Sequence, residues 1–429
     1  MPLKIVKTRS WLAAVLLTAA ALLCLTAAWF FIKWNFINVA AANLDPSRPE
    51  SMLVVDWLTQ VSPNDPQTHF AAASLFEKTF ETDDLTRSLR EYEMAAALSP
   101  HNYVMWLNLG KARSLNGDAE GAEAAYARAL ELAPNYSSVQ WVYGNLLIRE
   151  GKSDEGFALL SKAAVLNQAY ARTAVATALQ MTDGDVVQAR RMMGDSDITN
   201  VTLATSLAAL KRDDEAFDSW SRLTAADKAD NFGEQGQALV GEFAAAKRFQ
   251  LAARVEADLQ TSDAAKPAVG QVVNGGFETA VKLKDTNLFD WKIDDGLEPQ
   301  IGLTEAQKHS GNSSLWIAFD SFKASGFRAV SQTVAVVPAT SYELEIFYRS
   351  DIKSAATLKW EVADAATGKA IASTAPMVPT ADWTPIKAGF SVPADVDGVI
   401  IRLVREGCIG SSCRMSGKIF FDDISIRRV

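Results

Sequence analysis

Histidine and cysteine are scarce in this sequence, with three of each among 429 residues. His69, His101 and His309 lie far apart, and the sequence contains no Ser–His–Asp arrangement, paired Cys/His metal set or phosphate-binding glycine loop. These absences argue against nucleophilic, zinc and nucleotide chemistry. A carboxylate pair for glycoside hydrolysis stays open, because such a pair is defined by separation in space. We expect a protein that is not an enzyme.

An excess of basic residues is also missing. The 42 lysines and arginines stand against 51 aspartates and glutamates, which gives a net charge of −9 and a pI of about 5.1. A nucleic-acid backbone requires a basic surface, so no nucleic-acid partner is expected. The hydrophobic share of 48% is ordinary for globular proteins, and the length allows two or three domains.

One long hydrophobic run is present near the N-terminus. Residues 11–32, WLAAVLLTAAALLCLTAAWFFI, carry no charge and as a helix would span about 30 Å of hydrocarbon. Lys4, Lys7 and Arg9 precede the run, so the positive-inside rule places residues 1–10 in the cytoplasm. We expect a single transmembrane helix over 11–32, with the bulk of the protein in the periplasm or another extracytoplasmic space.

A cleaved signal peptide is the alternative for this segment. VAAAN at residues 39–43 offers small residues at which a peptidase could cut. The apolar run is longer than the roughly 7–15 residues of a signal peptide, which favours an uncleaved anchor. Cys24 follows leucines rather than the small residue of a lipoprotein site, so we interpret it as lipid-facing or packed.

The two remaining cysteines, Cys408 and Cys413, belong to the segment CIGSSC. They could close a small disulfide loop in an oxidising compartment, and we predict that they do. A metal site is the alternative, but two thiols without a second pair make at best half of a zinc site.

A helical repeat pattern occupies the middle of the chain. Around residues 101–134 a bulky residue, small residues suited to a helix crossing and a final proline occur in order: Trp106, Gly110, Ala122, Tyr126, Ala129 and Pro134. Gly110 and Ala122 would let two helices approach closely, and Pro134 cannot continue the second helix. The pattern resembles a tetratricopeptide repeat, and we interpret these residues as its core and end.

Similar patterns flank this unit. Segments 64–100 and 135–168 repeat the scheme, and weaker helix–turn–helix patterns continue to residue 260. We therefore expect an all-α solenoid over residues 50–260, with a groove that binds a partner protein. The segment 261–271, which is rich in small residues and contains a proline, predicts a linker.

From Val272 onward the hydrophobic period changes from helical to alternating. Short segments such as SYELEIFYRS and GVIIRLVRE are separated by turns that contain glycine or proline. Residues 272–429 therefore predict an all-β, two-sheet sandwich of about eight to ten strands. The expected fold class is multidomain, with a transmembrane helix, an α-solenoid and a β-sandwich in that order.

The order of motifs in this last domain is more specific than any one of them. NGGFE opens it, FDWKI and HSGNSSLWI follow, and FFDDISI closes it. The series resembles carbohydrate-binding modules of the family-4/9 type, which have a galactose-binding-like jelly-roll fold. The resemblance covers residues 272–429.

The resemblance implies a structural calcium ion that ties the first strand to the last. Its ligands would be the Glu278 carboxylate, a carbonyl near Gly276, backbone of the HSGNS turn, and Asp422 or Asp423. Hydrogen bonds from these carboxylates to backbone amides are the alternative. Which aspartate would coordinate stays open, because neighbouring residues on a strand point to opposite faces.

Glycan binding requires aromatic rings that lie against pyranose C–H groups and polar groups for hydroxyls. The candidates that we predict are Trp316, Phe327, Tyr348, Trp360 and Arg349. Trp291, Trp383, Gln332 and Arg402 come second, because residues at such positions commonly serve packing or structure.

Two functions from different classes remain. In the first, a membrane-anchored scaffold binds a partner protein through its repeats and a glycan through its sandwich, in the export or assembly of a surface polysaccharide. In the second, a structural assembly factor contacts proteins through both domains and binds no sugar. An exposed aromatic strip on the concave sheet would favour the first. A sandwich with polar faces and a large apolar patch facing the solenoid would favour the second.

Overall fold

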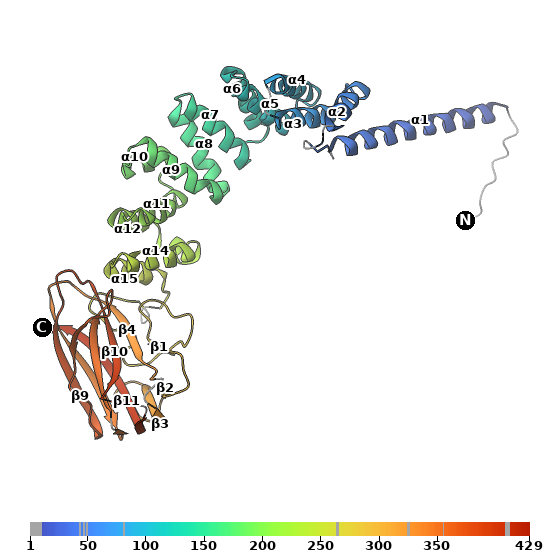
Figure 1. Cartoon of the computed structure of the whole chain (residues 1–429). Coiled ribbons are helices and arrows are strands. Elements are labelled where there is room, and N and C mark those ends of the chain that lie inside the picture. The colour runs from blue at the N-terminus through green and yellow to red at the C-terminus, as the bar shows by residue number, and fades with distance from the viewer. Residues whose placement is uncertain are drawn as a thin grey trace. The chain divides into compact units, whose positions relative to one another are not determined.

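The computed structural model describes residues 11–42, 44–45, 48, 50–79, 82–262, 266–323, 327–354, 356–407 and 412–429. The chain forms two compact units, one ending at Ala174 but including Met192–Gly194, and the other formed by Val175–Arg191 and Asp195–Val429. The first unit is helical, and the second combines helices with antiparallel sheets (Figure 1). The expected order of an apolar helix, a helical region and a β-domain is confirmed.

The first helix, α1 (Trp11–Ala42), is ten residues longer than the predicted span. Among the described residues it is the one helix long and apolar enough to cross a membrane, over Ala13–Ala41. A signal sequence near the N-terminus satisfies the same criteria of length and apolar character. The helix continues past Lys33, where residues 34–42 are still mostly apolar and Ile37 and Ala41 pack on the helices that follow.

The end of α1 packs against α2 (Glu50–Val61) and α3 (Pro66–Glu77). Ile37 and Ala41 of α1 are buried together with Leu58 of α2 in one apolar cluster. The Lys33 amine donates a hydrogen bond to the Val61 carbonyl at 3.4 Å. The Trp34 indole donates to Asp65 at 3.4 Å. The last turns of α1 are therefore part of the core of the first unit.

The helices that follow in the first unit pack as consecutive pairs (Figure 1). Their bounds are α4 (Thr82–Leu98), α5 (Tyr103–Leu115), α6 (Ala119–Leu132), α7 (Ser137–Arg149) and α8 (Ser153–Leu166), followed by the short η1 (Gln168–Tyr170). The pairs α3–α4, α5–α6 and α7–α8 match the three strongest segments of the sequence pattern. Helical hairpins are thus present where they were expected, and their assignment as tetratricopeptide repeats stays a prediction.

Close helix crossings in these hairpins depend on small residues. A Cβ on Gly110 of α5 would lie 2.6 Å from ring carbons of Tyr126 in α6, so only glycine fits there. Ala122, Tyr126 and Ala129 are buried, as predicted. Trp106 is partly buried and donates to the Pro100 carbonyl at 3.0 Å. Pro134 is not a core residue, because it is exposed in the turn after α6.

The second unit begins with further helices. Their bounds are α9 (Ala171–Met181) and α10 (Val186–Met193), both shared between the two units, followed by α11 (Asp197–Ala209), α12 (Asp213–Ser221), α13 (Ala225–Asp230), α14 (Gly233–Ala245) and α15 (Phe249–Leu259). Arg190 of α10 is buried and donates to Asn200 at 3.0 Å and to Ser219 at 2.9 Å. This arginine therefore ties α10 to α11 and α12.

Two antiparallel sheets form the β-domain (Figure 1). One has the order β1-β4-β10-β7-β8, and the other has the order β2-β3-β11-β5-β9, with β6 paired to β11. The bounds are β1 (Lys292–Ile293), β2 (Gln300–Thr304), β3 (Ser314–Lys323), β4 (Val330–Ala335), β5 (Ser341–Ser350), β6 (Lys353–Ser354), β7 (Thr357–Asp364), β8 (Ala370–Ser373), β9 (Thr380–Ser391), β10 (Gly398–Glu406) and β11 (Ser412–Arg428). The predicted β-sandwich is therefore observed, with β11 in the middle of its larger sheet.

Alternation along each strand fills the core between the sheets. On β5 the burial pattern changes at every residue, so Tyr342, Leu344, Ile346 and Tyr348 face inward. Trp360 of β7 is fully buried in the same cluster. The residues between these positions point outward and are available for other roles.

The last helix, α15, contacts the sandwich directly. Asp397, just before β10, accepts hydrogen bonds from the backbone N–H of Phe249 at 2.9 Å and of Gln250 at 3.4 Å. The Phe249 ring lies against Gly398, where a Cβ would be 2.4 Å from it. The Gln250 side chain also donates to the Val336 carbonyl at 3.0 Å. The segment predicted as a linker, 261–271, therefore does not keep the last helix apart from the sandwich.

Candidate functional site

The outer face of the six-stranded sheet carries a row of aromatic residues. In the strand register Trp316 of β3 pairs with Phe420 of β11, and Phe420 pairs with Arg349 of β5. All three side chains are partly exposed, whereas the neighbouring Tyr348 and Phe421 are buried. The row therefore results from strict alternation on three adjacent strands.

The row continues toward β9 through a stacked pair. His309, from the loop between β2 and β3, stacks on Phe347 of β5 with ring centroids 3.8 Å apart and planes at 13°. Trp383 of β9 lies 5.9 Å from the same histidine ring. We call the five aromatic residues Trp316, Phe420, Phe347, His309 and Trp383 the aromatic band. It reaches from β3 to β9, which is three strand spacings or about 14 Å.

Polar groups accompany the aromatic band. The Arg349 guanidinium donates to the Gln307 side chain at 2.6 Å, and the Trp316 indole donates to the Leu303 carbonyl at 3.2 Å. The Lys418 amine lies 5.9 Å from the centre of the Trp316 ring. Rings with fixed orientation beside hydrogen-bonding groups can stack on the C–H face of a sugar and contact its hydroxyls.

The outer face of the five-stranded sheet has a different character. Arg402 of β10 donates to Glu361 of β7 at 2.7 Å, and Lys359 of β7 pairs with Glu406 of β10 at 2.8 Å. These charged side chains are paired across the strands. Arg402 therefore stabilises the five-stranded sheet and is not part of the aromatic band. The two faces of the sandwich are thus chemically distinct.

Beside the aromatic band, Asp422 holds the loop before β3 to the last strand. Its Oδ2 accepts from the backbone N–H of His309 at 2.8 Å and of Ser310 at 3.2 Å, and its Oδ1 accepts from the N–H of Asp423 at 2.8 Å. The side chain is fully buried, and burial raises the pKa of this carboxyl above its usual range. The aspartate therefore fixes the loop that carries His309.

Two further carboxylates bind the same loop. Glu278 accepts from the backbone N–H of Asn312 at 2.9 Å, and this bond holds the pKa of Glu278 below its usual range. Asp423 has a left-handed backbone with φ of 47°, and its carboxylate contacts the His309 imidazole at 2.6 Å and the Ser310 hydroxyl at 2.9 Å. A Cβ on Gly276 would lie 3.6 Å from Asp423 Oδ1 and 3.7 Å from Asp422 Oδ1.

The predicted calcium ligands Gly276, Glu278, Asp422 and Asp423 are thus brought together around the HSGNS turn. Carboxylate oxygens have the chemistry that calcium prefers. In this structure, however, they accept hydrogen bonds from N–H and O–H groups, and no group of three or more acidic, histidine or cysteine side chains with metal-binding geometry occurs among the described residues. The cluster as arranged acts through hydrogen bonds, and calcium stays a prediction.

The predicted glycan contacts are only partly brought together. Trp316 and Arg349 lie in the row on the outer face. Phe327 stacks on the core residue Phe319 with ring centroids 6.4 Å apart, at the margin of the core. The predictions for Tyr348 and Trp360 are wrong for this surface, because both side chains are buried between the sheets.

The secondary glycan-binding candidates serve packing or structure, with one exception. Gln332 is buried and exchanges hydrogen bonds of 2.8 and 3.1 Å with the backbone of Val273. Trp291 is buried and donates to the Asn274 carbonyl at 3.1 Å. Trp383, in contrast, is partly exposed beside His309 and joins the aromatic band.

Three members of the aromatic band were missed by sequence reasoning. Phe420 and Phe421 are adjacent in KIFFDDIS, and alternation with the buried Ile419 and Phe421 would have placed Phe420 outward. Phe347 alternates with Ile346 and Tyr348 in the same way. His309 carried no such signal, because it lies in a loop. The predicted disulfide falls on Cys408 and on the side chain of Cys413, which lie outside the described residues.

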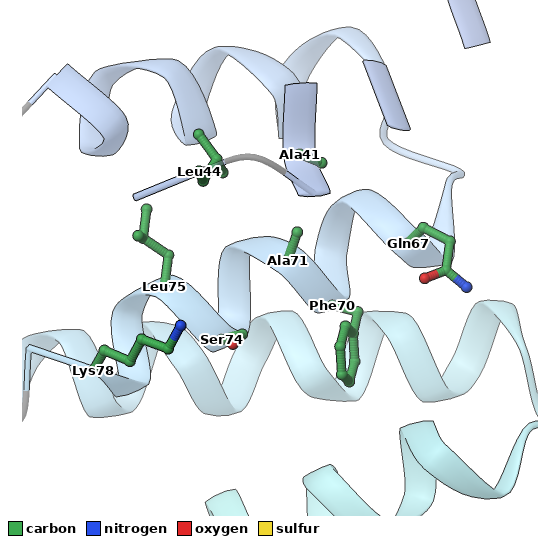
Figure 2. Close-up of a pocket in the computed structure, with 8 residues that line it drawn as sticks. All are labelled: Ala41, Leu44, Gln67, Phe70, Ala71, Ser74, Leu75 and Lys78. Atoms are coloured by element: carbon green, nitrogen blue, oxygen red, sulfur yellow. The ribbon is translucent and has the colours of Figure 1, made fainter. Parts of the chain in front are cut away.

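A cavity in the first unit is a second candidate site. It has a volume of about 500 Å³ and lies between the face of α3 and the segment that follows α1. In Figure 2 the side chains of Ala71 and Leu75 point from α3 toward the segment that holds Ala41 and Leu44. The lining residues are Ala41, Leu44, Gln67, Phe70, Ala71, Ser74, Leu75 and Lys78.

A scan against protein-family models finds no match, and neither does a search of curated proteins. Among solved structures, a family-61 carbohydrate-binding module in complex with β-1,4-galactotriose is 17% identical, with 36% of this chain and 96% of that chain covered and a TM-score of 0.27. A family-4 module is 16% identical, with 37% and 99% covered and a TM-score of 0.28.

The Clostridium thermocellum endo-1,4-β-xylanase 10B, in a structure of its family-22 and catalytic modules with xylohexaose, is 16% identical, with 38% of this chain and 29% of that chain covered and a TM-score of 0.26. TM-scores this low carry no argument about the fold. The assignment of a β-sandwich therefore rests on the strand pairing described above.

Proposed function

We propose that this chain is a membrane-anchored, non-enzymatic scaffold that binds a glycan through the aromatic band and a partner protein through its helical region. The setting that fits this combination is the export or assembly of a surface polysaccharide outside the cytoplasm. The observation that carries the proposal is the aromatic band on the outer face of the six-stranded sheet.

The aromatic band supports the glycan-binding function over the protein-assembly function. A glycan-binding sandwich needs partly exposed rings on one face, and Trp316, Phe420 and Trp383 supply them. The rings are held by the strand register and by the bonded loop at Asp422, so little ordering is needed when a sugar stacks on them. An assembly factor that binds no sugar would not require aromatic residues in this arrangement.

Glycan binding is tested with the full-length protein in detergent, offered immobilised β-galactan, xylan and β-glucan. We expect retention on at least one polysaccharide, weakened about tenfold or more by Trp316→Ala or Phe420→Ala. Lys369 is exposed in the turn between β7 and β8. Lys369→Ala is the matched control, and this variant should bind as the wild type does. Wild-type protein that binds none of the panel would favour the protein-assembly role, and binding that survives both changes would overturn the aromatic band as the glycan site.

Anchoring by an uncleaved α1 is supported by the packing of its last turns. Ile37 and Ala41 are buried with Leu58, so removal of α1 would expose the core of the first helices. A signal peptide that is cut away has no reason to be built into that core. Mass spectrometry of protein from the membrane fraction tests this part. We expect residues 11–42 to be retained, and a mature terminus near residue 43 would overturn the anchor.

The cavity of Figure 2 supports the partner-binding part of the proposal. Its apolar wall from α3 and α1 lies beside Lys78 and Ser74, so it can take an apolar side chain of a protein and a hydrogen-bonding group next to it. Ala71→Phe would fill the cavity without adding charge. We expect this change to reduce recovery of a cross-linked partner from cells, while Trp316→Ala leaves that recovery unchanged.

A calcium ion at the carboxylate cluster is retained as a lesser proposal. Its support is the gathering of Glu278, Asp422 and Asp423 around Gly276. Calcium should raise the thermal unfolding temperature of the full-length protein, and Glu278→Gln should abolish that rise. An unfolding temperature that does not respond to calcium would show that the cluster acts through hydrogen bonds alone.

A further inference from the structure

The second helix, α2, exposes an apolar stripe. Ser51, Val55 and Leu58 are buried, whereas Leu53, Val54 and Trp57 are 74%, 39% and 50% exposed. At about 100° per residue, positions 53, 54 and 57 fall on one side of a helix. Single exposed apolar residues are common on proteins, but three that line one side of a helix form a patch.

The stripe lies on the flank of α2 that does not face α3 and α4. Val55 packs in a cluster with α3, and Asp56 forms an ion pair with Arg87 of α4 at 2.6 Å. Leu58, on another side of the helix, packs on α1. At about 100° per residue the stripe is centred roughly 150° from Val55, so it faces away from α3. Val54 is its member nearest to Leu58 and α1, whereas Leu53 lies nearer to Asp56.

The contacts of α2 fix its direction along α1. Its C-terminal residue, Val61, accepts the hydrogen bond from Lys33, and Leu58 packs on Ile37 and Ala41 farther along α1. The two helices therefore run in opposite directions. Val61 stands level with the end of the uncharged run, and Trp57 is one turn, or about 6 Å, beyond it.

This level coincides with the polar layer of a bilayer in which α1 is embedded. The headgroup region extends about 5–8 Å beyond the hydrocarbon on each side. Past Lys33, α1 itself still exposes Phe36 and Val39, about 4 to 9 Å along its axis. Aromatic side chains such as Trp57 and Phe36 are favoured at the boundary between hydrocarbon and headgroups.

We propose that Phe36 and Trp57, with Val39 at the outer edge, form a membrane collar that seats the first helices in the headgroup layer. Val54 and Leu53 lie about 10 to 12 Å beyond the uncharged run, outside that layer. The inference rests on the proposed anchoring by α1 and goes beyond it, because an anchor alone requires only α1. The collar continues the exposed apolar surface of α1, where residues such as Trp29 and Phe30 are also exposed, and this continuity argues for lipid as its partner. Contact with lipid on two helices would hold the helical region close to the membrane.

The test uses the full-length protein in lipid nanodiscs, with a benzophenone amino acid introduced at single positions. Position 57 reports on the collar, and position 30, inside the uncharged run, reports on the anchor. Position 136 is the matched control, because Tyr136 is an aromatic residue of the same unit that is as exposed as Trp57. We expect lipid adducts after illumination at positions 30 and 57 and none at 136.

The outcomes separate the collar from the anchor. Lipid adducts at position 30 without adducts at position 57 would overturn the collar and leave the anchor standing. Adducts at position 57 to a second copy of the chain or to another protein would overturn lipid as the partner. Absence of lipid adducts at position 30 would refute the anchor, and the collar with it.

Discussion

The helical region is joined to an apolar helix at one end of its sequence and to a β-sandwich at the other, and different groups build the two joints. The first joint is apolar, with Ile37 and Ala41 of α1 packed on Leu58. The second adds carboxylates to the apolar contact between Phe249 and Gly398. Asp397 of the sandwich accepts hydrogen bonds at the start of α15, and Glu256 of α15 is buried against the sandwich.

The consequence of this difference is a different response to pH. Burial raises the pKa of Glu256 to about 7, although backbone groups of Phe289 and Leu288 form hydrogen bonds that oppose the rise. Burial also raises the pKa of Asp397. Apolar contacts at the first joint have no such dependence. Attachment of the sandwich should therefore respond to pH, whereas attachment of α1 should not.

The largest effect is expected when the apolar part of the second joint is removed. Phe249→Ala leaves a cavity beside Gly398 and should lower the free energy of opening of α15 by about 3–5 kcal/mol. Hydrogen exchange of the α15 amides measures this quantity. Phe217→Ala, at a partly exposed ring on α12 whose centre lies 5.7 Å from the Arg254 guanidinium of α15, is the control and should cost much less. Equal exchange in the two variants would show that Phe249 does not hold the joint.

At the first joint, Leu58→Ala should lower the free energy of opening of α2 by about 2–5 kcal/mol. Because the lost contacts are apolar, the loss should be the same at about pH 5 and about pH 8. Hydrogen exchange of the α2 amides at both pH values measures it. Leu53→Ala, on the exposed stripe of the same helix, should have little effect in detergent. A loss that depends on pH would contradict the contrast between the joints.

The pH response of the second joint depends on Glu256. Its pKa is higher in the folded protein, about 7, than the usual value of 4.5 for a glutamate. The folded state therefore keeps a proton that the unfolded state releases, and the free energy of unfolding should fall by up to about 3 kcal/mol as pH rises between these values. Glu256→Gln should flatten this dependence in the thermal unfolding of the second unit. An unchanged pH profile in that variant would assign the response to other groups.

The smallest effect concerns the cap at the start of α15. Asp397→Ala removes the acceptor for the N–H groups of Phe249 and Gln250 and should destabilise α15 by about 1 kcal/mol. Asp395→Ala, an exposed aspartate two residues earlier, is the matched control. Hydrogen exchange confined to the first turn of α15 distinguishes a lost cap from general unfolding.

Local sequence features predicted the helical hairpins well. Gly110 and Tyr126 belong to one short repeat, so their contact follows from helix periodicity and a turn between them. The bond between Asp397 and Phe249 joins residues 148 positions apart, and no period in the sequence links them. The contact between α15 and the sandwich could therefore not be predicted from the sequence, in which residues 261–271 suggested a linker.

Prediction of the residues in the candidate site was limited by how strictly strand alternation was applied. Tyr348 and Arg349 are neighbours on β5, so they cannot both lie on the outer face, yet both were predicted as glycan contacts. Strict alternation from the apolar Leu344 and Ile346 places Tyr348 inward. Trp316 was found because its neighbours Leu315 and Ile317 are apolar. His309 could not be found in this way, since a loop has no period.

β11 follows every other strand in the chain, and it lies between β3 and β5 in the finished sheet. Before it is synthesised, the pairs β2–β3 and β5–β9 each present an unpaired edge. Unpaired edges of this kind recruit other strands and promote aggregation. The growing chain is therefore most vulnerable just before its last strand emerges from the ribosome, and truncation ahead of residue 412 would leave two half-sheets that lack the strand between them.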